Sequence, residues 1–152
     1  MTTASKVISA LAGKTLVTAE SLTGGGIGAA LTAVPGASKV FLGGVISYTD
    51  AVKREVLGVS RADLDTCGAV SAPVARDMAL GARKLLRSDI AVAVTGLAGP
   101  DGDEFGHPVG TVFIGYADEK TVMTQQYLFT GDREAVRLQT IEAALQLILE
   151  NA

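Results

Sequence analysis

The chain has 152 residues, of which 48% are hydrophobic, and its formal net charge is −3. This length suits one folded domain with a sizeable core, and no apolar run approaches the roughly 20 residues of a membrane-spanning helix. The slight negative charge and the scattered basic residues exclude the electrostatic footprint of a nucleic-acid-binding protein, so we expect a small-molecule partner.

The first half of the chain alternates between helical and extended segments. Strands are expected over residues 15–19 and 39–48, and helices over residues 5–12, 27–34, 51–57 and 60–68. Gly43 and Gly44 interrupt the second strand and are expected to bulge it. Ser60 and Asp63 resemble a capping box, which marks the start of a helix.

The second half predicts a longer helix from Ser71, a buried strand over 90–94, a hairpin of strands 109–116 and 122–129, and a last helix capped by Asp132. The residues expected to face the core from the two helices are Val74, Met78, Ala82, Leu85, Leu138, Ile141, Leu145 and Ile148. Interleaved helices and strands with one hairpin predict the α/β class, as a single-domain layered α/β/α sandwich over residues 1–152 with a mixed β-sheet.

Two of the apolar strands end in glycine-rich turns, Ser21-Leu22-Thr23-Gly24-Gly25-Gly26 and, after residue 94, Thr95-Gly96-Leu97-Ala98-Gly99-Pro100-Asp101-Gly102. Each glycine inside a helix weakens it by about 0.5–1 kcal/mol relative to alanine, so the first run indicates a backbone that lies close to a ligand. The N–H groups of a helix start suit a phosphate or a developing oxyanion. Ser21 is expected at the N-cap, where it could cap the helix or act on the ligand. The two turns predict one crevice at the carboxyl edge of the sheet.

Several familiar sites are excluded by the residues present. The chain has no P-loop, no Gly-x-Gly-x-x-Gly turn and no Gly-x-Ser-x-Gly elbow. The single histidine, His107, and the single cysteine, Cys67, are too few for a zinc site of such ligands. Because Cys67 cannot form an internal disulfide, we expect a reducing, cytoplasmic setting. Asp101, Asp103 and Glu104 could hold magnesium, although acidic loops are usually solvated.

A serine nucleophile without a histidine partner needs another base, and lysine is the usual substitute. Lys53 and Tyr48 both lie at the predicted junction of a strand and a helix, where both could face the crevice beside Ser21. A lysine base must be desolvated or lie near another cation to be neutral at neutral pH. The alternative is a Lys53 on a solvated helix face and a Tyr48 packed at the end of the strand.

Arg133 and Arg137 lie one turn apart at the start of the last helix, where the helix dipole disfavours cations and like charges repel. This conflict indicates a bound anion. The alternative is that Asp132 and Glu134 neutralise the two arginines.

The segment Ala19-Glu20-Ser21-Leu22-Thr23-Gly24-Gly25 resembles the Ala-Glu-Ser-Cys-Thr-Gly-Gly motif of the CinA C-terminal-domain proteins, the nicotinamide-nucleotide amidohydrolases. The similarity continues in the same order over nearly the whole chain, through residues 43–48 with Lys53, 68–71, 95–102, 108–112 and 131–133 with Arg137. The ordered set is specific, whereas any one segment would be a weak signal. The chain resembles a stand-alone form that lacks the larger N-terminal domain of CinA proteins.

The resemblance implies hydrolysis of the carboxamide of nicotinamide mononucleotide to nicotinate mononucleotide and ammonia, without a metal or cofactor. By position, Ser21 would be the nucleophile and Lys53 its base, with Tyr48 assisting proton transfer. The implied substrate-binding residues are Thr23, Gly24, Gly25, Thr95, Gly96 and Arg137, the last of them near the phosphate. We also expect a homo-oligomer, with a dimer favoured.

Two departures from the family pattern bear on activity. Leu22 replaces the usual cysteine, which changes the shape of the pocket. Asp50 stands where asparagine is common, and an acidic neighbour raises the pKa of a lysine and makes it a poorer base. The alternative function is therefore a non-catalytic pyridine-nucleotide-binding module that has lost amidase activity; a third is an amidase for a different small carboxamide.

Overall fold

A computed structural model describes all residues from 1 to 152 and contains one mixed five-stranded sheet in the order β2-β1-β3-β4-β5. The strands are β1 (Leu16–Glu20), β2 (Phe41–Ile46), β3 (Ile90–Gly96), β4 (Thr111–Ala117) and β5 (Val122–Leu128). The sheet is mixed because β1 lies parallel to both β2 and β3, whereas β4 is antiparallel to both β3 and β5. The predicted hairpin is the β4–β5 pair.

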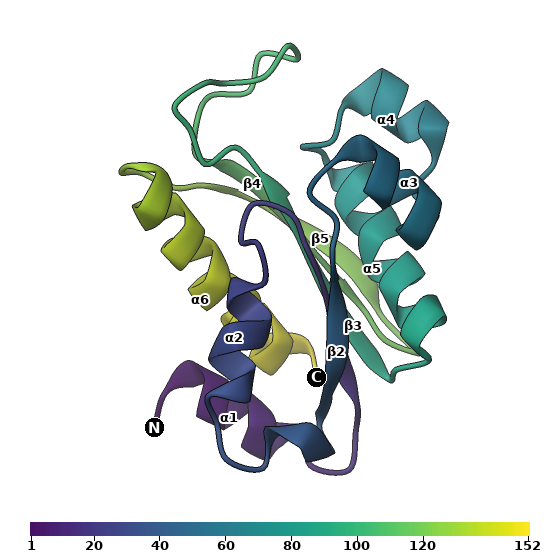
Figure 1. The fold of residues 1–152 in the computed structure, drawn as a ribbon, viewed down its shortest axis with the longest axis vertical. Coiled ribbons are helices and arrows are strands. Elements are labelled where there is room, and N and C mark those ends of the chain that lie inside the picture. Colours follow the sequence, from purple (N-terminus) through teal and green to yellow (C-terminus); the bar gives the residue numbers. More distant parts are fainter.

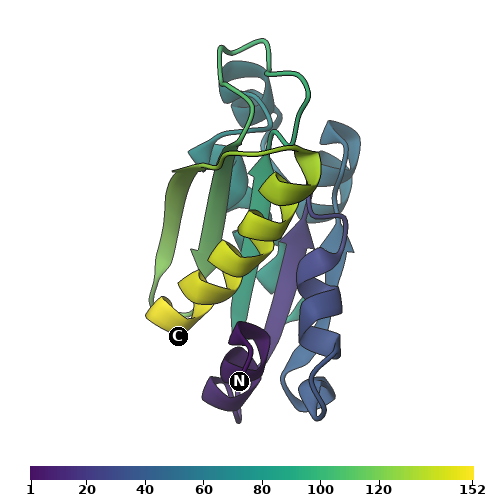
Figure 2. The same cartoon turned by 90° about the vertical axis from the view of Figure 1, so that its left-hand side faces the viewer.

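Helices cover both faces of this sheet (Figures 1 and 2). One face carries α1 (Thr3–Ala10), α2 (Gly26–Thr32) and α6 (Arg133–Asn151), and the other carries α3 (Asp50–Leu57), α4 (Arg61–Cys67) and α5 (Ala72–Leu86). A short 3-10 helix, Ala37–Lys39, precedes β2. This arrangement confirms the predicted α/β/α sandwich with a mixed sheet. None of the helices combines the length and the apolar character needed to cross a membrane.

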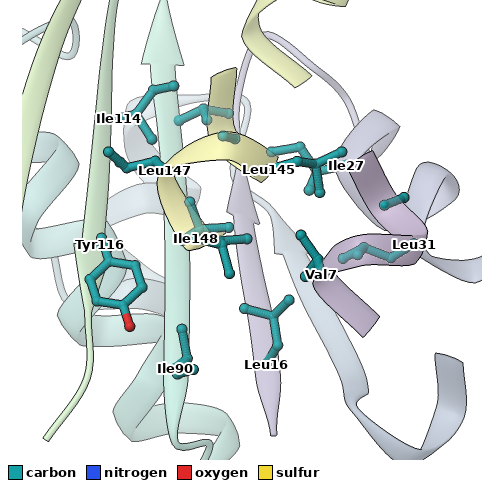
Figure 3. Close-up of a cluster of buried hydrophobic side chains, with 14 of the residues drawn as sticks. Val7, Leu16, Ile27, Leu31, Ile90, Ile114, Tyr116, Leu145, Leu147 and Ile148 are labelled. Atoms are coloured by element: carbon teal, nitrogen blue, oxygen red, sulfur yellow. The ribbon is translucent and has the colours of Figure 1, made fainter. Parts of the chain in front are cut away.

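The hydrophobic core is divided by the sheet, because successive side chains of a strand point to opposite faces. On the α6 side, Leu16 and Ile90 pack with Ile148 and with residues of α1 and α2 (Figure 3). On the α5 side, the strands present smaller residues, and the buried set there includes Val17, Ala19, Ala91, Ala93, Met78, Ala79 and Ala82. All five residues of β1 are buried, which fits a strand covered on both faces.

Three predicted helix starts and the predicted bulge of β2 are present in the structure. The side chains of Ser60, Ser71 and Asp132 each accept a hydrogen bond from a backbone N–H of the first turn of α4, α5 and α6, respectively. In the β1–β2 pairing, Leu16 opposes Phe41 and Val17 opposes Gly43, so β2 bulges at Leu42, directly before the two glycines predicted to bulge it.

Two of the predicted core residues are wrong. Leu138 is 58% exposed, because it lies about 200° around α6 from the buried Val136 and so points to solvent. Leu85 is 50% exposed, because the last turn of α5 faces a surface groove beside Val56 and Gly58 rather than the sheet. Ile141, Leu145 and Ile148 do pack against the core.

Candidate active site

A cavity of about 330 Å³ lies at the carboxyl ends of β1 and β3, where the two glycine-rich turns meet. Its lining includes Ser21 and Leu22 from the first turn, residues 95–101 from the second, and Tyr48 and Lys53 from the segment after β2. The sequence predicted one crevice at this edge of the sheet, and the cavity confirms it.

Ser21 and Lys53 form a buried hydrogen-bonded pair in this cavity. The Lys53 Nζ lies 3.0 Å from the Ser21 Oγ and donates to it. The same ammonium donates to the backbone oxygens of Ser47, at 2.8 Å, and Tyr48, at 3.4 Å. Lys53 is only 1% exposed and Ser21 only 7% exposed. The alternative of a solvated Lys53 is therefore wrong, because α3 aims this side chain inward toward the end of β1.

Burial in this position lowers the pKa of Lys53 from 10.5 to about 8, and the nearby carboxylate of Asp50 acts against this shift by raising it. The desolvation of the ammonium is the larger of the two effects. With a pKa of about 8, roughly a tenth of the Lys53 side chains are neutral amines at pH 7. The pair thus contains a hydroxyl and a base that is available near neutral pH.

The opposing effect of Asp50 yields a testable prediction. We expect Asp50→Asn to move the pKa of Lys53 below about 8, because the change removes the negative charge that favours the ammonium form. An NMR titration that follows the Lys53 side chain measures this directly. Asp65→Asn, at an exposed position of α4, is the matched control and should leave the titration unchanged. An unchanged or raised Lys53 pKa in Asp50→Asn would contradict the prediction.

Ser21 is not the N-cap of α2, contrary to expectation. The helix begins at Gly26, and its N-cap is Gly25, whose φ of 102° lies in the left-handed region that favours glycine. The N–H groups of the first turn bond instead to the carboxylate of Glu20, with Ile27 N at 2.8 Å and Gly28 N at 3.0 Å. The anion position at the start of α2 is therefore filled by the protein's own side chain, and the Ser21 hydroxyl is left for Lys53.

Glu20 is the site residue that sequence reasoning missed. An acidic residue at the end of a buried strand, directly before a glycine-started helix, is the signal that could have found it. It changes the interpretation of Thr23, Gly24 and Gly25, none of which lines the cavity. The hydroxyl of Thr23 donates to Glu20 at 2.7 Å, and both glycines have a positive φ that the turn requires.

Two backbone N–H groups of the glycine-rich turn after β1 have no acceptor within the protein, and one of them, that of Leu22, belongs to a residue that lines the cavity. The N–H groups of Leu22 and Thr23 make no hydrogen bond within the protein, whereas the N–H of Gly24 bonds to the Ser21 oxygen. Both free donors follow Ser21 directly in the chain. A backbone N–H next to a nucleophile is a common donor to an oxyanion.

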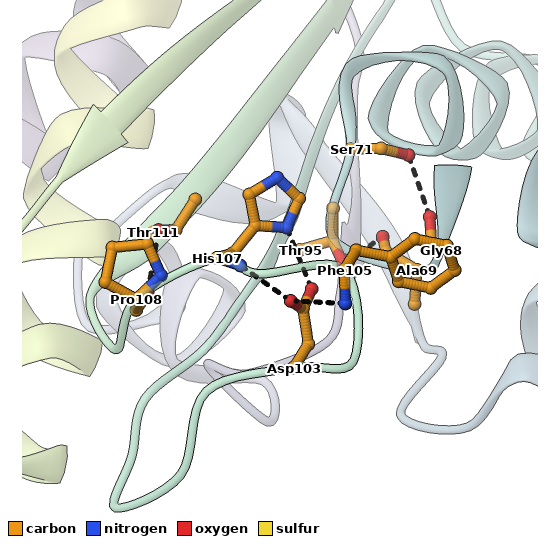
Figure 4. A network of polar contacts seen from close by, with 9 residues as sticks. All are labelled: Gly68, Ala69, Ser71, Thr95, Asp103, Phe105, His107, Pro108 and Thr111. Atoms are coloured by element: carbon orange, nitrogen blue, oxygen red, sulfur yellow. Dashed lines mark hydrogen bonds and ion pairs between the residues drawn. The ribbon is translucent and has the colours of Figure 1, made fainter. Parts of the chain in front are cut away.

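Thr95 and Gly96 line the opposite wall of the cavity; Figure 4 shows Thr95 beside Ala69. The Thr95 hydroxyl donates to the Ala69 oxygen at 2.8 Å, which ties the end of β3 to the segment before α5. A Cβ on Gly96 would lie 2.8 Å from the Thr111 oxygen and 2.6 Å from a Val112 methyl carbon, so β4 leaves room only for glycine here.

The acidic loop beyond this wall is held together by hydrogen bonds to the side chain of Asp103 (Figure 4). The carboxylate of Asp103 accepts from the N–H groups of Phe105 and His107 and lies 2.8 Å from the His107 Nδ1. His107 is not part of the cavity lining. The structure holds no group of three or more His, Cys, Asp or Glu side chains that could bind a metal ion.

The two arginines of α6 bond to backbone oxygens on either side of the cavity. Arg133 lines it and donates from Nη1 to the Gly99 oxygen, at 2.6 Å, and from Nη2 to the Tyr48 hydroxyl, at 3.1 Å. Arg137 does not line it and donates to the oxygens of Leu22, at 2.9 Å, and Thr23, at 3.2 Å. These carbonyl oxygens offset the positive charge at the helix start, and no ion pair joins either arginine to Asp132 or Glu134. The structure thus places Arg137 behind the turn rather than toward a ligand.

Comparison with known proteins identifies the family of the chain. Residues 2–152 match the family model described as the CinA C-terminal domain. The chain is 50% identical over 128 residues to a CinA-like protein of Geotalea uraniireducens (strain Rf4), which covers 84% of this chain and 30% of the relative, and 53% identical over 128 residues to a CinA-like protein of Synechococcus sp. (strain CC9311), which covers 83% and 30%. It therefore spans about a third of the length of these curated relatives.

Solved structures show the same fold. The competence damage-inducible protein A (ComA) of Klebsiella pneumoniae superposes with a TM-score of 0.96 at 37% identity, over 98% of this chain and 94% of that one. The competence/damage inducible protein CihA of Agrobacterium tumefaciens superposes with a TM-score of 0.94 at 38% identity, over 97% and 92%. From its sequence, its fold and the match over nearly its full length, the chain belongs to the CinA C-terminal domain family.

Proposed function

We propose that the protein hydrolyses the carboxamide of nicotinamide mononucleotide to nicotinate mononucleotide and ammonia. The observation that carries this proposal is the buried Lys53 Nζ, 3.0 Å from the Ser21 Oγ in a cavity at the carboxyl edge of the sheet. The low pKa of Lys53, about 8, suits a general base that works near neutral pH.

The reaction transfers the acyl group twice, first from the amide nitrogen to Ser21 and then from Ser21 to water. Ser21 Oγ attacks this carbon while its proton passes to the neutral amine of Lys53, and a tetrahedral intermediate forms. The resulting ammonium of Lys53 returns the proton to the amide nitrogen, the C–N bond breaks, and ammonia leaves an ester on Ser21. Lys53 then takes a proton from water, whose oxygen attacks the ester carbon, and the C–O bond to Ser21 breaks with return of that proton to Oγ.

The other residues of the cavity are proposed to stabilise the oxyanion, to assist proton transfer and to contact the pyridine ring. The free N–H group of Leu22, which lines the cavity, is the proposed donor to the oxyanion of each tetrahedral intermediate. Tyr48, with a 58% exposed side chain at the cavity rim, is proposed to assist proton transfer through its hydroxyl. Thr95 and Gly96 would lie against the pyridine ring from the opposite wall.

We assign the substrate phosphate to Arg133 rather than to Arg137. Arg133 is the only arginine that lines the cavity, and its guanidinium can exchange neutral partners, a carbonyl and a phenol, for a phosphate. Arg137 stays bonded behind the turn, where it supports Leu22 and Thr23. The helix start of α2 is not available to the phosphate, because Glu20 fills it.

The rival function, a binding module that has lost its chemistry, rests on Asp50. Burial outweighs Asp50 in setting the pKa of Lys53, so the observation favours the enzyme. The expected dimer stays a prediction, which light scattering on the purified protein checks.

A panel of three substrates tests the proposal. We expect ammonia release from nicotinamide mononucleotide to exceed release from nicotinamide by at least about 10²-fold, because only the nucleotide carries a phosphate for Arg133. NAD, whose phosphate is esterified, should be a poor substrate. Binding of the mononucleotide without ammonia release would favour the binding module, and faster release from a carboxamide without phosphate would favour a different amidase.

A further inference from the structure

The carboxylate of Glu20 is buried beside the proposed nucleophile without a cationic partner. Glu20 is only 2% exposed, and no lysine or arginine forms an ion pair with it. Instead, Oε1 accepts from the Thr23 hydroxyl and the Ile27 N–H, and Oε2 accepts from the Gly28 N–H, at 3.0 Å, and the Thr18 hydroxyl, at 3.3 Å. Four donors converge on two oxygens, which is the full accepting capacity of a carboxylate.

Glu20 is connected to Ser21 through the turn and to Lys53 through Ser47. Through its side chain, Glu20 holds Thr23 and the start of α2, and thus both ends of the turn that begins at Ser21. Through its backbone oxygen, it accepts from the Ser47 N–H at 2.8 Å. The Ser47 oxygen in turn accepts from the Lys53 Nζ at 2.8 Å.

We propose that Glu20 is a positioning residue for the hydrolysis proposed above, on which this inference rests. Its carboxylate fixes the 21–25 turn so that Ser21 Oγ stays within hydrogen-bond distance of Lys53 Nζ. It acts through Ser21 and does not touch the substrate. A buried carboxylate that accepts four hydrogen bonds holds a turn more firmly than a single helix-capping hydrogen bond does. Moving the turn would leave the buried carboxylate without its hydrogen-bond donors, which costs free energy.

The variant Glu20→Gln tests this role at constant side-chain size. A glutamine offers one oxygen and one NH₂, so the NH₂ faces either the Ile27 N–H or the Gly28 N–H, and two donors oppose each other. The turn must shift to separate them. We expect kcat to fall about 10²-fold, since small misplacements of reacting groups have effects of this size, while KM changes less than about threefold because Glu20 is not in the cavity lining.

Three further measurements separate positioning from stability alone. Thr23→Val removes one hydroxyl donor and should lower kcat by a smaller factor than Glu20→Gln, again at nearly constant KM. Ile148→Val removes a methylene from the core near the C-terminal end of α6, at the opposite end of this helix from Arg133, and should lower Tm without lowering kcat. The rate at which a fluorophosphonate labels the Ser21 hydroxyl reports its position without any amide substrate, and should fall in Glu20→Gln in parallel with kcat.

The outcomes decide separately whether Glu20 positions Ser21 and whether the protein carries out the proposed hydrolysis. The inference is overturned if folded Glu20→Gln keeps its kcat and labelling rate within about twofold of the wild type, or if its activity falls only as far as its folded fraction. If Glu20→Gln does not fold, Thr23→Val decides in the same way. If the wild type releases no ammonia but its Ser21 is labelled, the proposed reaction fails and the labelling rates still decide the role of Glu20. A wild-type Ser21 that is not labelled overturns both.

Discussion

Replacing Ser21 by alanine is expected to reduce ammonia release by roughly 10⁴-fold or more, because the change removes the only hydroxyl bonded to Lys53. The stability of the protein should change little. Ser21 caps no helix, and its Oγ takes part in only one side-chain hydrogen bond, whose donor Lys53 keeps two backbone acceptors. Steady-state ammonia release and urea denaturation measure the two effects.

Ser60→Ala is the matched control for this experiment. Ser60 is the N-cap of α4, and its loss should lower the free energy of unfolding by about 1 kcal/mol. Ammonia release per folded molecule should be unaffected, because Ser60 does not line the cavity. Wild-type turnover by a well-folded Ser21→Ala protein would remove Ser21 as the nucleophile.

Lys53→Met is expected to abolish turnover, with a loss of roughly 10³-fold or more, while most of the affinity for nicotinamide mononucleotide remains. The reason is that Lys53 moves protons in the proposed mechanism, whereas the phosphate is assigned to Arg133. Calorimetry with the mononucleotide and the ammonia assay measure binding and turnover. If affinity is lost while turnover of the bound complex is normal, Lys53 binds the phosphate instead.

The same variant also reveals the pKa of Lys53 without any substrate. The unfolded chain keeps the Lys53 proton up to a pH near 10.5, whereas the folded protein releases it near pH 8. Between these values the unfolded state binds more protons, so the free energy of unfolding of the wild type should rise with pH relative to Lys53→Met. A pKa difference of this size corresponds to a rise of about 3 kcal/mol. Lys39→Met, at an exposed position, should show no such rise, and parallel pH curves for wild type and Lys53→Met would contradict the low pKa.

Most of the fold could be predicted because its signals are local. Ser60, Ser71 and Asp132 cap helices through hydrogen bonds to N–H groups only a few residues away, and β2 bulges directly before Gly43. The crevice was also predictable, since the carboxyl ends of parallel neighbouring strands meet at one edge. Lys53 could be named as a candidate base, but its burial depends on the packing of α3 against the end of β1, which no local pattern encodes.

The roles of Glu20 and Arg137 were both missed. An acidic residue at the end of β1 was a local signal for Glu20, whereas the contacts of Arg137 depend on tertiary packing. A glycine-started helix suggests an empty anion site until the strand end is seen to place the Glu20 carboxylate there. The pattern of Arg133 and Arg137 indicated an anion, but the carbonyl oxygens that Arg137 contacts lie more than 110 residues earlier in the chain. Leu138 was wrongly predicted to be buried, because the apolar residues of α6 extend beyond the face of the helix that packs on the core.

The contact of Arg137 with Leu22 and Thr23 has a consequence for the order in which a newly made chain becomes competent. Within residues 1–152, β1 and the turn with Ser21 are synthesised well before α6. The turn after β1 therefore lacks its guanidinium support, and the cavity lacks Arg133, until α6 has been made and has docked on the sheet. A nascent chain stalled before residue 133 would carry both Ser21 and Lys53 and still have an incomplete pocket.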